Sequence, residues 1–89
     1  MTYYVYLIKT EKKKNNKFIS YVGYTNNLKN RLKKHNLGKG AKFTRGKKWI
    51  LVYYEKFDTK NLALKREIEI KKNRKMRNLL KNMREELIF

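Results

Sequence analysis

Residues 18–24 read FISYVGY, a run of aromatic and β-branched residues with a single glycine near its end. Such residues favour an extended strand, whereas glycine weakens a strand unless a bulge, a turn or a closely approaching group requires it. Upstream, residues 2–9 (TYYVYLIK) have the same character, and the polar segment 10–17 separates the two runs. The pattern predicts an antiparallel hairpin in which Gly23 marks a bulge, a strand end or a close approach.

The first predicted strand is apolar at both alternating sets of positions. We expect it to be covered on both faces, or covered on one face while the other lines a cleft. After the hairpin, the caps at 25–27 predict a helix over 28–36. A basic, glycine-bearing loop at 38–47 then leads to a third strand at 48–57.

From about Lys60 to Leu87 neither glycine nor proline interrupts a helical pattern. Asn73 is a plausible break, and the pattern does not decide between one helix and two. An amphipathic face is expected for Met76, Leu79, Leu80, Met83 and Leu87. We therefore predict one α/β (α+β) domain over residues 1–89, a three-stranded antiparallel sheet flanked by helices in the order β-β-α-β-α-α.

The charge of the chain indicates its partner. Lys and Arg number 25 against seven Asp and Glu, and the formal net charge is +18. No acidic residue lies between Glu11 and Glu55, an interval rich in Lys and Arg. A polyanion offsets the self-repulsion of such a surface, so we expect nucleic acid as the partner. A merely soluble, lysine-rich surface is the alternative.

Several classes of protein are disfavoured by composition. The chain has no cysteine and one histidine, so it has no disulfide and its composition disfavours a zinc site. The absence of cysteine is compatible with the reducing cytoplasm, where we place the protein. No run reaches the length of a transmembrane helix, and the positive charge is not gathered on one amphipathic helix, so we expect no membrane partner.

The helix predicted over 28–36 directs two chemically useful side chains to one place. Leu28 and Leu32 mark its buried stripe, and at about 100° per residue Arg31 and His35 lie about 40° apart at the edge of that stripe. The alternative is a surface cation beside a half-buried histidine.

Glu67 is the carboxylate most suited to bind a metal. It shares a helix face with Ala63 and Ile70, whereas Glu69 points about 200° away, towards solvent. A carboxylate that faces the body of a domain is costly unless it is paired or binds a metal. A structural ion pair is the alternative, with Arg66, Lys71 or another arginine as the partner.

Tyrosines are concentrated in the first two strands, where a hydroxyl in a cleft could orient a water molecule or act as a general base. Packing in the core and on the sheet surface explains several of them equally well. One inward carboxylate, an arginine, tyrosines and strong positive charge fit metal-assisted phosphodiester cleavage better than acyl transfer.

Four segments resemble the GIY-YIG nuclease superfamily. YVYLI at 4–8 followed by YVG at 21–23 resembles its paired motifs, and NNLKNRLKKHN at 26–36 resembles its first-helix signature. LALKREIEIK at 62–71 resembles the segment with the metal-binding glutamate. The loop GKGAKFTRG at 38–46 resembles the small stand-alone members, the group named for likeness to UvrC and intron-encoded endonucleases.

The resemblance implies roles for single residues. Arg31 would stabilise the transition-state phosphate, and Glu67 would hold one divalent cation, Mg²⁺ or Mn²⁺. Tyr6 would match the tyrosine of the first motif, and Tyr21 and Gly23 would match the tyrosine and the glycine of the second. His35 would match a position that is His or Tyr in relatives.

We therefore expect a small metal-dependent endonuclease that acts on DNA, single-stranded or branched forms included, with low sequence selectivity. The expected nucleic-acid contacts are Gly23, Lys34, Lys39, Lys42, Arg45 and Lys47. Two alternatives stay open: a nucleic-acid-binding domain with weak or no catalysis, and a basic RNA- or ribosome-associated protein. A further protein partner could supply targeting, and the sequence predicts no oligomeric state.

Overall fold

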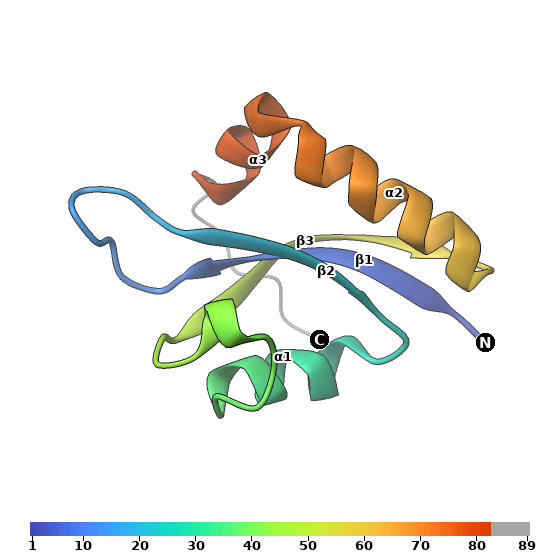
Figure 1. Cartoon of the computed structure of the whole chain (residues 1–89), viewed down its shortest axis with the longest axis horizontal. Coiled ribbons are helices and arrows are strands. Elements are labelled where there is room, and N and C mark those ends of the chain that lie inside the picture. Colours follow the sequence, from blue (N-terminus) through green and yellow to red (C-terminus); the bar gives the residue numbers. More distant parts are fainter. Residues whose placement is uncertain (83–89) are drawn as a thin grey trace.

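The computed structural model describes residues 1–82. A three-stranded antiparallel sheet lies at its centre in the order β2-β1-β3 (Figure 1). The elements are β1 (Tyr3–Thr10), β2 (Ser20–Thr25), α1 (Leu28–Asn36), the 3₁₀ turn η1 (Lys42–Thr44), β3 (Trp49–Phe57), α2 (Lys60–Lys72) and α3 (Arg74–Lys81). The predicted fold class and element order are confirmed.

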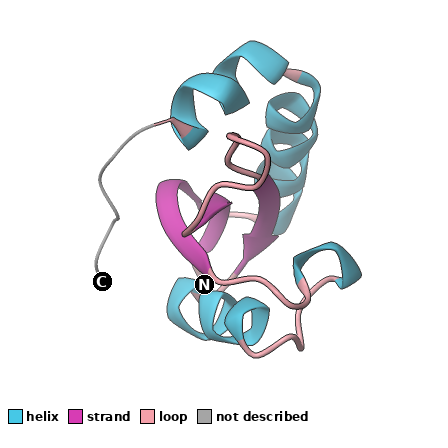
Figure 2. Cartoon of the chain, turned by 90° about the vertical axis from the view of Figure 1, so that its left-hand side faces the viewer, coloured by secondary structure: helices cyan, strands magenta, loops and turns pink. Residues whose placement is uncertain are grey.

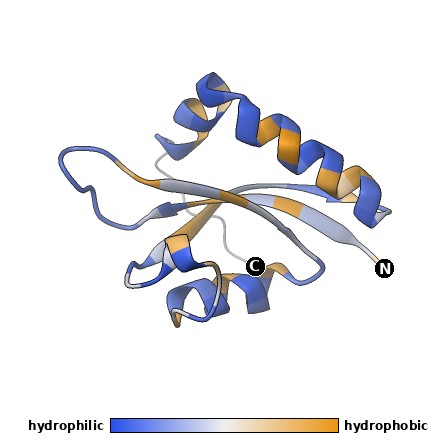
Figure 3. Ribbon diagram, in the orientation of Figure 1, coloured by the Kyte–Doolittle hydropathy of each residue, from blue (hydrophilic) through white to orange (hydrophobic). Residues whose placement is uncertain are grey.

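Two layers of helix enclose the sheet. α2 and α3 lie over one face, and α1 with η1 lies over the other (Figures 1 and 2). The central strand is therefore buried on both faces, as its two apolar sets predicted: Val5 and Leu7 belong to the core on the α2 side, whereas Tyr6 and Ile8 belong to the core on the α1 side. Apolar positions gather at the centre of the sheet and polar ones on the outer helix surfaces (Figure 3).

The register of the hairpin places the two candidate tyrosines on one face. Tyr6 pairs with Gly23, and Ile8 pairs with Tyr21. Because partners directly opposite in an antiparallel pair point to the same side, Tyr6 and Tyr21 both face α1. The pairing of β1 with β2 runs without a shift through Gly23, so this glycine is neither a bulge nor a strand end.

The long helical pattern after residue 60 is broken at Asn73. α2 ends at Lys72, and the Asn73 side chain accepts a hydrogen bond from the Met76 backbone N–H at 3.0 Å, which caps the start of α3. Met76 and Leu80 then pack against the core on the α2 side. Leu79, expected on the same face, is 69% exposed, so that prediction was wrong.

The error at Leu79 has a geometric cause. The break at Asn73 leaves a short α3 whose contact with the core is narrow, and Leu79 lies about 100° around the helix from Leu80, beyond that contact. Met83 and Leu87, expected on this face as well, lie outside the described residues.

An ion pair ties β3 to α2. The Arg66 guanidinium donates to both carboxylate oxygens of Glu55, from Nε at 3.0 Å and from Nη2 at 3.1 Å. Hydrogen bonding from Arg66 and Tyr53 outweighs the effect of burial and holds the pKa of Glu55 below its usual value. Across residues 1–82 no helix has the length and apolar character to cross a membrane.

Candidate active site

The Tyr6 hydroxyl is the centre of a buried hydrogen-bonded chain. Its side chain crosses from β1 towards α1, where its oxygen lies 2.7 Å from His35 Nε2 and 3.3 Å from Arg31 Nε. On the other side of the imidazole ring, His35 Nδ1 lies 2.8 Å from the Thr44 hydroxyl. Tyr6 is only 2% exposed and His35 is fully buried. Helix α1 thus directs both candidate side chains to one oxygen, which is the arrangement that their spacing predicts.

The direction of each hydrogen bond in this chain follows from the groups available. The Thr44 hydroxyl donates its proton to the Ala41 carbonyl at 2.9 Å, so its oxygen accepts from His35 Nδ1–H. A neutral imidazole protonated at Nδ1 leaves Nε2 as an acceptor, and Nε2 therefore receives the Tyr6 O–H. Arg31 Nε–H in turn donates to the Tyr6 oxygen. Among residues 1–82 no buried side-chain nitrogen or oxygen lacks a hydrogen-bond partner.

The environment keeps this chain in that protonation state. Burial, followed by the charge of Arg31, lowers the pKa of His35 to about 4. Burial raises the pKa of Tyr6 to about 12, although the hydrogen bond from Arg31 acts in the opposite direction. At neutral pH His35 is therefore an uncharged acceptor and Tyr6 an uncharged donor, while Arg31 keeps its positive charge.

Two glycines make room for the chain. A Cβ atom at Gly23 would lie 2.5 Å from the Tyr6 hydroxyl oxygen, and one at Gly40 would lie 2.5 Å from His35 Nδ1. Both positions are thus places of close approach. At Gly23, however, the approaching group is the Tyr6 phenol and not a phosphate, so the space expected for a phosphate is already filled.

Arg31 stands at the wall of an open cleft. The cleft has a volume of about 600 Å³, and its walls are formed by the start of β1, the end of β2, helix α1 with the residues before it, and the start of α2. It contains three cationic side chains, those of Arg31, Lys34 and Lys60. Lys60 Nζ also lies 5.9 Å from the centre of the Tyr24 ring. A cleft with three cations and several amide side chains suits a phosphate group.

Tyr21 extends the site along the edge strand β2. Its ring packs edge-on against His35 with centroids 5.2 Å apart, and it stacks on Phe43 of η1 at 6.2 Å. Tyr21 also contributes, after Tyr6, to raising the pKa of Arg31. The structure therefore brings Tyr6, Tyr21, Arg31 and His35 together.

Glu67 approaches from the other helical layer. Its side chain is 13% exposed and pairs with Lys71 Nζ at 3.5 Å, one turn along α2. Its charge is close enough to raise the pKa of Tyr6 slightly. Arg66, a possible partner of Glu67, instead binds Glu55 on β3. The ion pair with Lys71 is solvent-exposed on the lysine side and therefore weak.

The residues around Glu67 suit a hard divalent cation only if a single carboxylate holds it and other ligands complete its shell. Among residues 1–82 no group of three or more His, Cys, Asp or Glu side chains could hold a metal ion. Mg²⁺ commonly binds proteins through one or two carboxylates and completes its shell with water and substrate phosphate. A single, largely buried carboxylate fits that mode, and Glu67 is not among the residues that line the Arg31 cleft.

The basic residues expected to contact nucleic acid are spread more widely. Of these, Lys34 lies in the cleft beside Arg31. Lys39, Lys42 and Arg45 are exposed around η1. Lys47 donates to the Phe43 carbonyl at 3.3 Å, and its ammonium lies 5.6 Å from the centre of that ring. It therefore lies outside the Arg31 cleft.

Sequence reasoning missed the residues that hold His35 in place. Thr44 and Gly40 both come from the loop after α1, and Asn36 anchors that loop by bonding the Trp49 backbone at both N–H and carbonyl. The Trp49 indole N–H closes the loop by donating to the Thr44 carbonyl at 2.9 Å. The loop carried the family likeness, but nothing in its pattern indicated which of its side chains turns inward.

Comparison with known proteins now identifies the class. The model of the GIY-YIG catalytic domain matches residues 2–81. The chain therefore belongs to the GIY-YIG family of nuclease domains.

Its relatives in this family carry the name UPF0213. The UPF0213 protein SH2523 of Staphylococcus haemolyticus is 46% identical over 70 residues, which cover 78% of this chain and 79% of that protein. The UPF0213 protein HQ_3675A of Haloquadratum walsbyi is 52% identical over 52 residues, and the match spans 57% of this chain and 58% of the relative. The chain is also similar to the UPF0213 protein BH0048 from Bacillus halodurans, whose solution NMR structure is known, with 36% sequence identity and a TM-score of 0.47. The match covers 90% of this chain and 82% of that chain.

Proposed function

We propose that this protein is a metal-dependent endonuclease that hydrolyses phosphodiester bonds in DNA with low sequence selectivity. The observation that carries the proposal is the position of Arg31, which lines an open cationic cleft while its Nε bonds the buried Tyr6 hydroxyl. Phosphoryl transfer needs positive charge fixed beforehand around the oxygens on which negative charge develops. A guanidinium held in place by a buried partner meets that need.

The residues divide the chemistry between them. Arg31, with Lys34 and Lys60 in the same cleft, binds the phosphate and neutralises its charge. A phosphate held by Arg31 lies beside the Tyr6 hydroxyl because the two side chains are in contact. Glu67 would hold the divalent cation, which supplies Lewis-acid stabilisation of the phosphate oxygens when bound.

Tyr6 and His35 provide a route for the proton of the attacking water. The Tyr6 oxygen accepts the water proton as the phenol passes its own proton to His35 Nε2, to which it is already bonded. Because the pKa of Tyr6 is about 12 and that of His35 about 4, ionising the pair in advance is costly. The two transfers therefore take place together with the attack.

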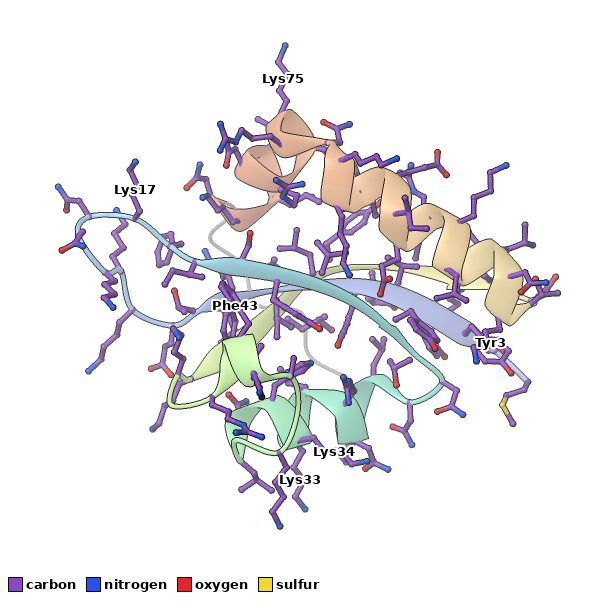
Figure 4. The ribbon with its side chains drawn as sticks, viewed as in Figure 1. Tyr3, Lys17, Lys33, Lys34, Phe43 and Lys75 are labelled. Atoms are coloured by element: carbon purple, nitrogen blue, oxygen red, sulfur yellow. The ribbon has the colours of Figure 1, made fainter. Side chains whose placement is uncertain are left out.

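The test is a cleavage assay on labelled single-stranded, duplex and flap DNA with Mg²⁺, with Mn²⁺ and with chelator. We expect metal-dependent cutting, and a loss of at least about a hundredfold in rate for Arg31→Ala, since a fixed cation of this kind contributes that much. Lys33→Ala is the matched control, because Lys33 lies on the same helix and points away from the sheet (Figure 4). Absence of cleavage on every substrate, or an equal loss in both variants, contradicts the proposal.

A further inference from the structure

A second cationic groove lies at the start of the edge strand β2, whereas the Arg31 cleft lies at the end of that strand. One wall comes from the β1–β2 loop and the start of β2, and the other from α3. Its volume is about 640 Å³. The lining residues are Lys14, Asn15, Lys17, Phe18, Ile19, Ser20, Arg74, Arg77, Asn78 and Lys81.

The charge of this groove is entirely positive. Its lining contains five cationic side chains, two from the loop and three from α3, and no carboxylate. The amide and hydroxyl groups of Asn15, Asn78 and Ser20 add donors that suit phosphate oxygens. Like charges on two facing walls repel each other, so the walls are stabilised by an anion placed between them.

The groove is continuous with the candidate active site. A smaller hollow of about 250 Å³ adjoins it along β2 and shares Ser20 and Arg77 with it. Tyr21 and Phe43 line this hollow, and Tyr21 packs against His35. The cationic surface of α3 therefore leads along the open edge of the sheet to the buried chain around Tyr6.

Aromatic rings accompany the cations along this path. Phe18 lies at one end, where Lys9 Nζ is 4.1 Å from its ring centre, and Phe43, 54% exposed, lies at the other. Figure 4 shows Lys17 on the arm of the loop that leads into β2, and Phe43 beside β2. An exposed ring such as that of Phe43 can stack on an unpaired base, which a duplex does not offer because its bases already stack on each other.

We propose that this groove, lined by Lys14, Lys17, Arg74, Arg77 and Lys81, binds the phosphate backbone of a single-stranded nucleic acid and leads that strand to the candidate active site. One part of this proposal, that the bound nucleic acid leads to the candidate active site, rests on the proposed function. The groove itself is tested by binding alone.

Binding of a fluorescent 20-nucleotide single strand is measured by anisotropy in chelator, at several salt concentrations. The groove variant is Lys17→Gln with Arg74→Gln, one residue from each wall. Arg77 is left unchanged because it donates to the Ile70 carbonyl at the end of α2. The control is Lys65→Gln with Lys75→Gln, two exposed lysines outside the groove, of which Lys75 points away from the sheet in Figure 4.

We expect the groove variant to bind the single strand at least about tenfold more weakly than the parent. The slope of log K against log salt should shrink by about 1.4, because the variant loses two phosphate contacts and each contributes about 0.7 on a single strand. The control is expected to change little, and a hairpin duplex of the same length is expected to lose less affinity than the single strand. Equal losses in the two variants, or an equal loss for duplex and single strand, overturn the proposal. Since no cleavage is needed, failure here is separate from failure of the nuclease assay.

Discussion

At the residue scale, the Tyr6 hydroxyl joins the two parts of the candidate site. It donates to His35 Nε2 and accepts from Arg31 Nε, so it links a buried neutral acceptor to a cation on the cleft wall. The same contacts explain why Gly23 has no side chain, since a Cβ there would collide with the phenol. The motif glycine is therefore required for packing of the motif tyrosine.

Removal of this hydroxyl tests its structural role. Tyr6→Phe leaves the buried His35 Nε2 without a donor, which costs about 1–3 kcal/mol. We expect urea denaturation to show a loss of that size, and cleavage per folded molecule to fall as well because Arg31 loses its partner. Tyr54→Phe is the control, since Tyr54 lies opposite Tyr6 in the register but is partly exposed. A Tyr6→Phe protein as stable and active as the parent contradicts the arrangement.

The buried histidine predicts how stability depends on pH. The pKa of His35 is about 4 in the folded protein against an ordinary value of 6.5, so between these values the unfolded chain binds more protons than the folded one. The free energy of unfolding should therefore fall as the pH drops from about 6.5 to about 4, by at most about 1.4 kcal/mol per pH unit from this group.

The comparison with His35→Gln isolates this contribution, because the ion pair of Glu55 with Arg66 also weakens in acid and remains in both proteins. Denaturant curves at pH 7, 6, 5 and 4 provide the measurement. The difference in stability between parent and variant should narrow as the pH falls. A constant difference over this range would show that His35 is not held neutral by its surroundings.

At the element scale, patterns of apolar residues predicted the sheet and the first helix well. Strand β1 is apolar at both alternating sets of positions and the hairpin signal is local, so the hairpin and the burial of β1 could be predicted from the sequence. The pairing of β3 with β1 was not predicted. The convergence of Arg31 and His35 followed from helical spacing alone. Thr44 and Gly40 could not be predicted, because their contacts with His35 depend on the path of an irregular loop.

The break between α2 and α3 shows a second limit of pattern reasoning. The sequence indicated Asn73 as a plausible break, but only tertiary packing decides whether a helix bends or continues. Because the chain bends there, the face of α3 that contacts the core is narrow, and Leu79 lies outside it. Met76 and Leu80 were predicted correctly, because they lie on the side of α3 that packs against the core.

The cap at Asn73 can be tested directly. Asn73→Ala removes the side-chain acceptor for the Met76 N–H, and the loss of such a cap costs about 1 kcal/mol. Asn61→Ala, an exposed position within the first turn of α2, serves as the control and is expected to be near neutral. Equal stability of both variants in urea would show that the Asn73 cap does not stabilise α3.

At the scale of the whole molecule, the net charge of +18 opposes folding. Repulsion between exposed cations is screened by salt, with a Debye length of about 30 Å at 0.01 M and about 10 Å at 0.1 M. We expect the melting temperature to rise as NaCl increases from 10 to 200 mM, and a short single-stranded oligonucleotide to produce a rise at low salt. A melting temperature that falls or stays constant with salt would contradict strong self-repulsion.

The arrangement of the charges also bears on the selectivity that we expect. The Arg31 cleft lies at the end of β2 and the groove beside α3 at its start, with the smaller hollow at Tyr21 next to the groove, so the three surfaces follow the same edge strand. Contacts to phosphates position a strand without reading its sequence, which is why we expect low selectivity.

The most direct test of the central claim compares two neighbouring glutamates of α2. Glu67 is largely buried near Tyr6, whereas Glu69 is about half exposed and lies 4.0 Å from Arg66 Nη1. Single-turnover cleavage of flap DNA is measured with Mg²⁺ for the parent, Glu67→Gln and Glu69→Gln. We predict that Glu67→Gln abolishes cleavage while oligonucleotide binding persists, and that Glu69→Gln cuts at the parental rate. Cleavage that survives Glu67→Gln unchanged would contradict the assignment of the site.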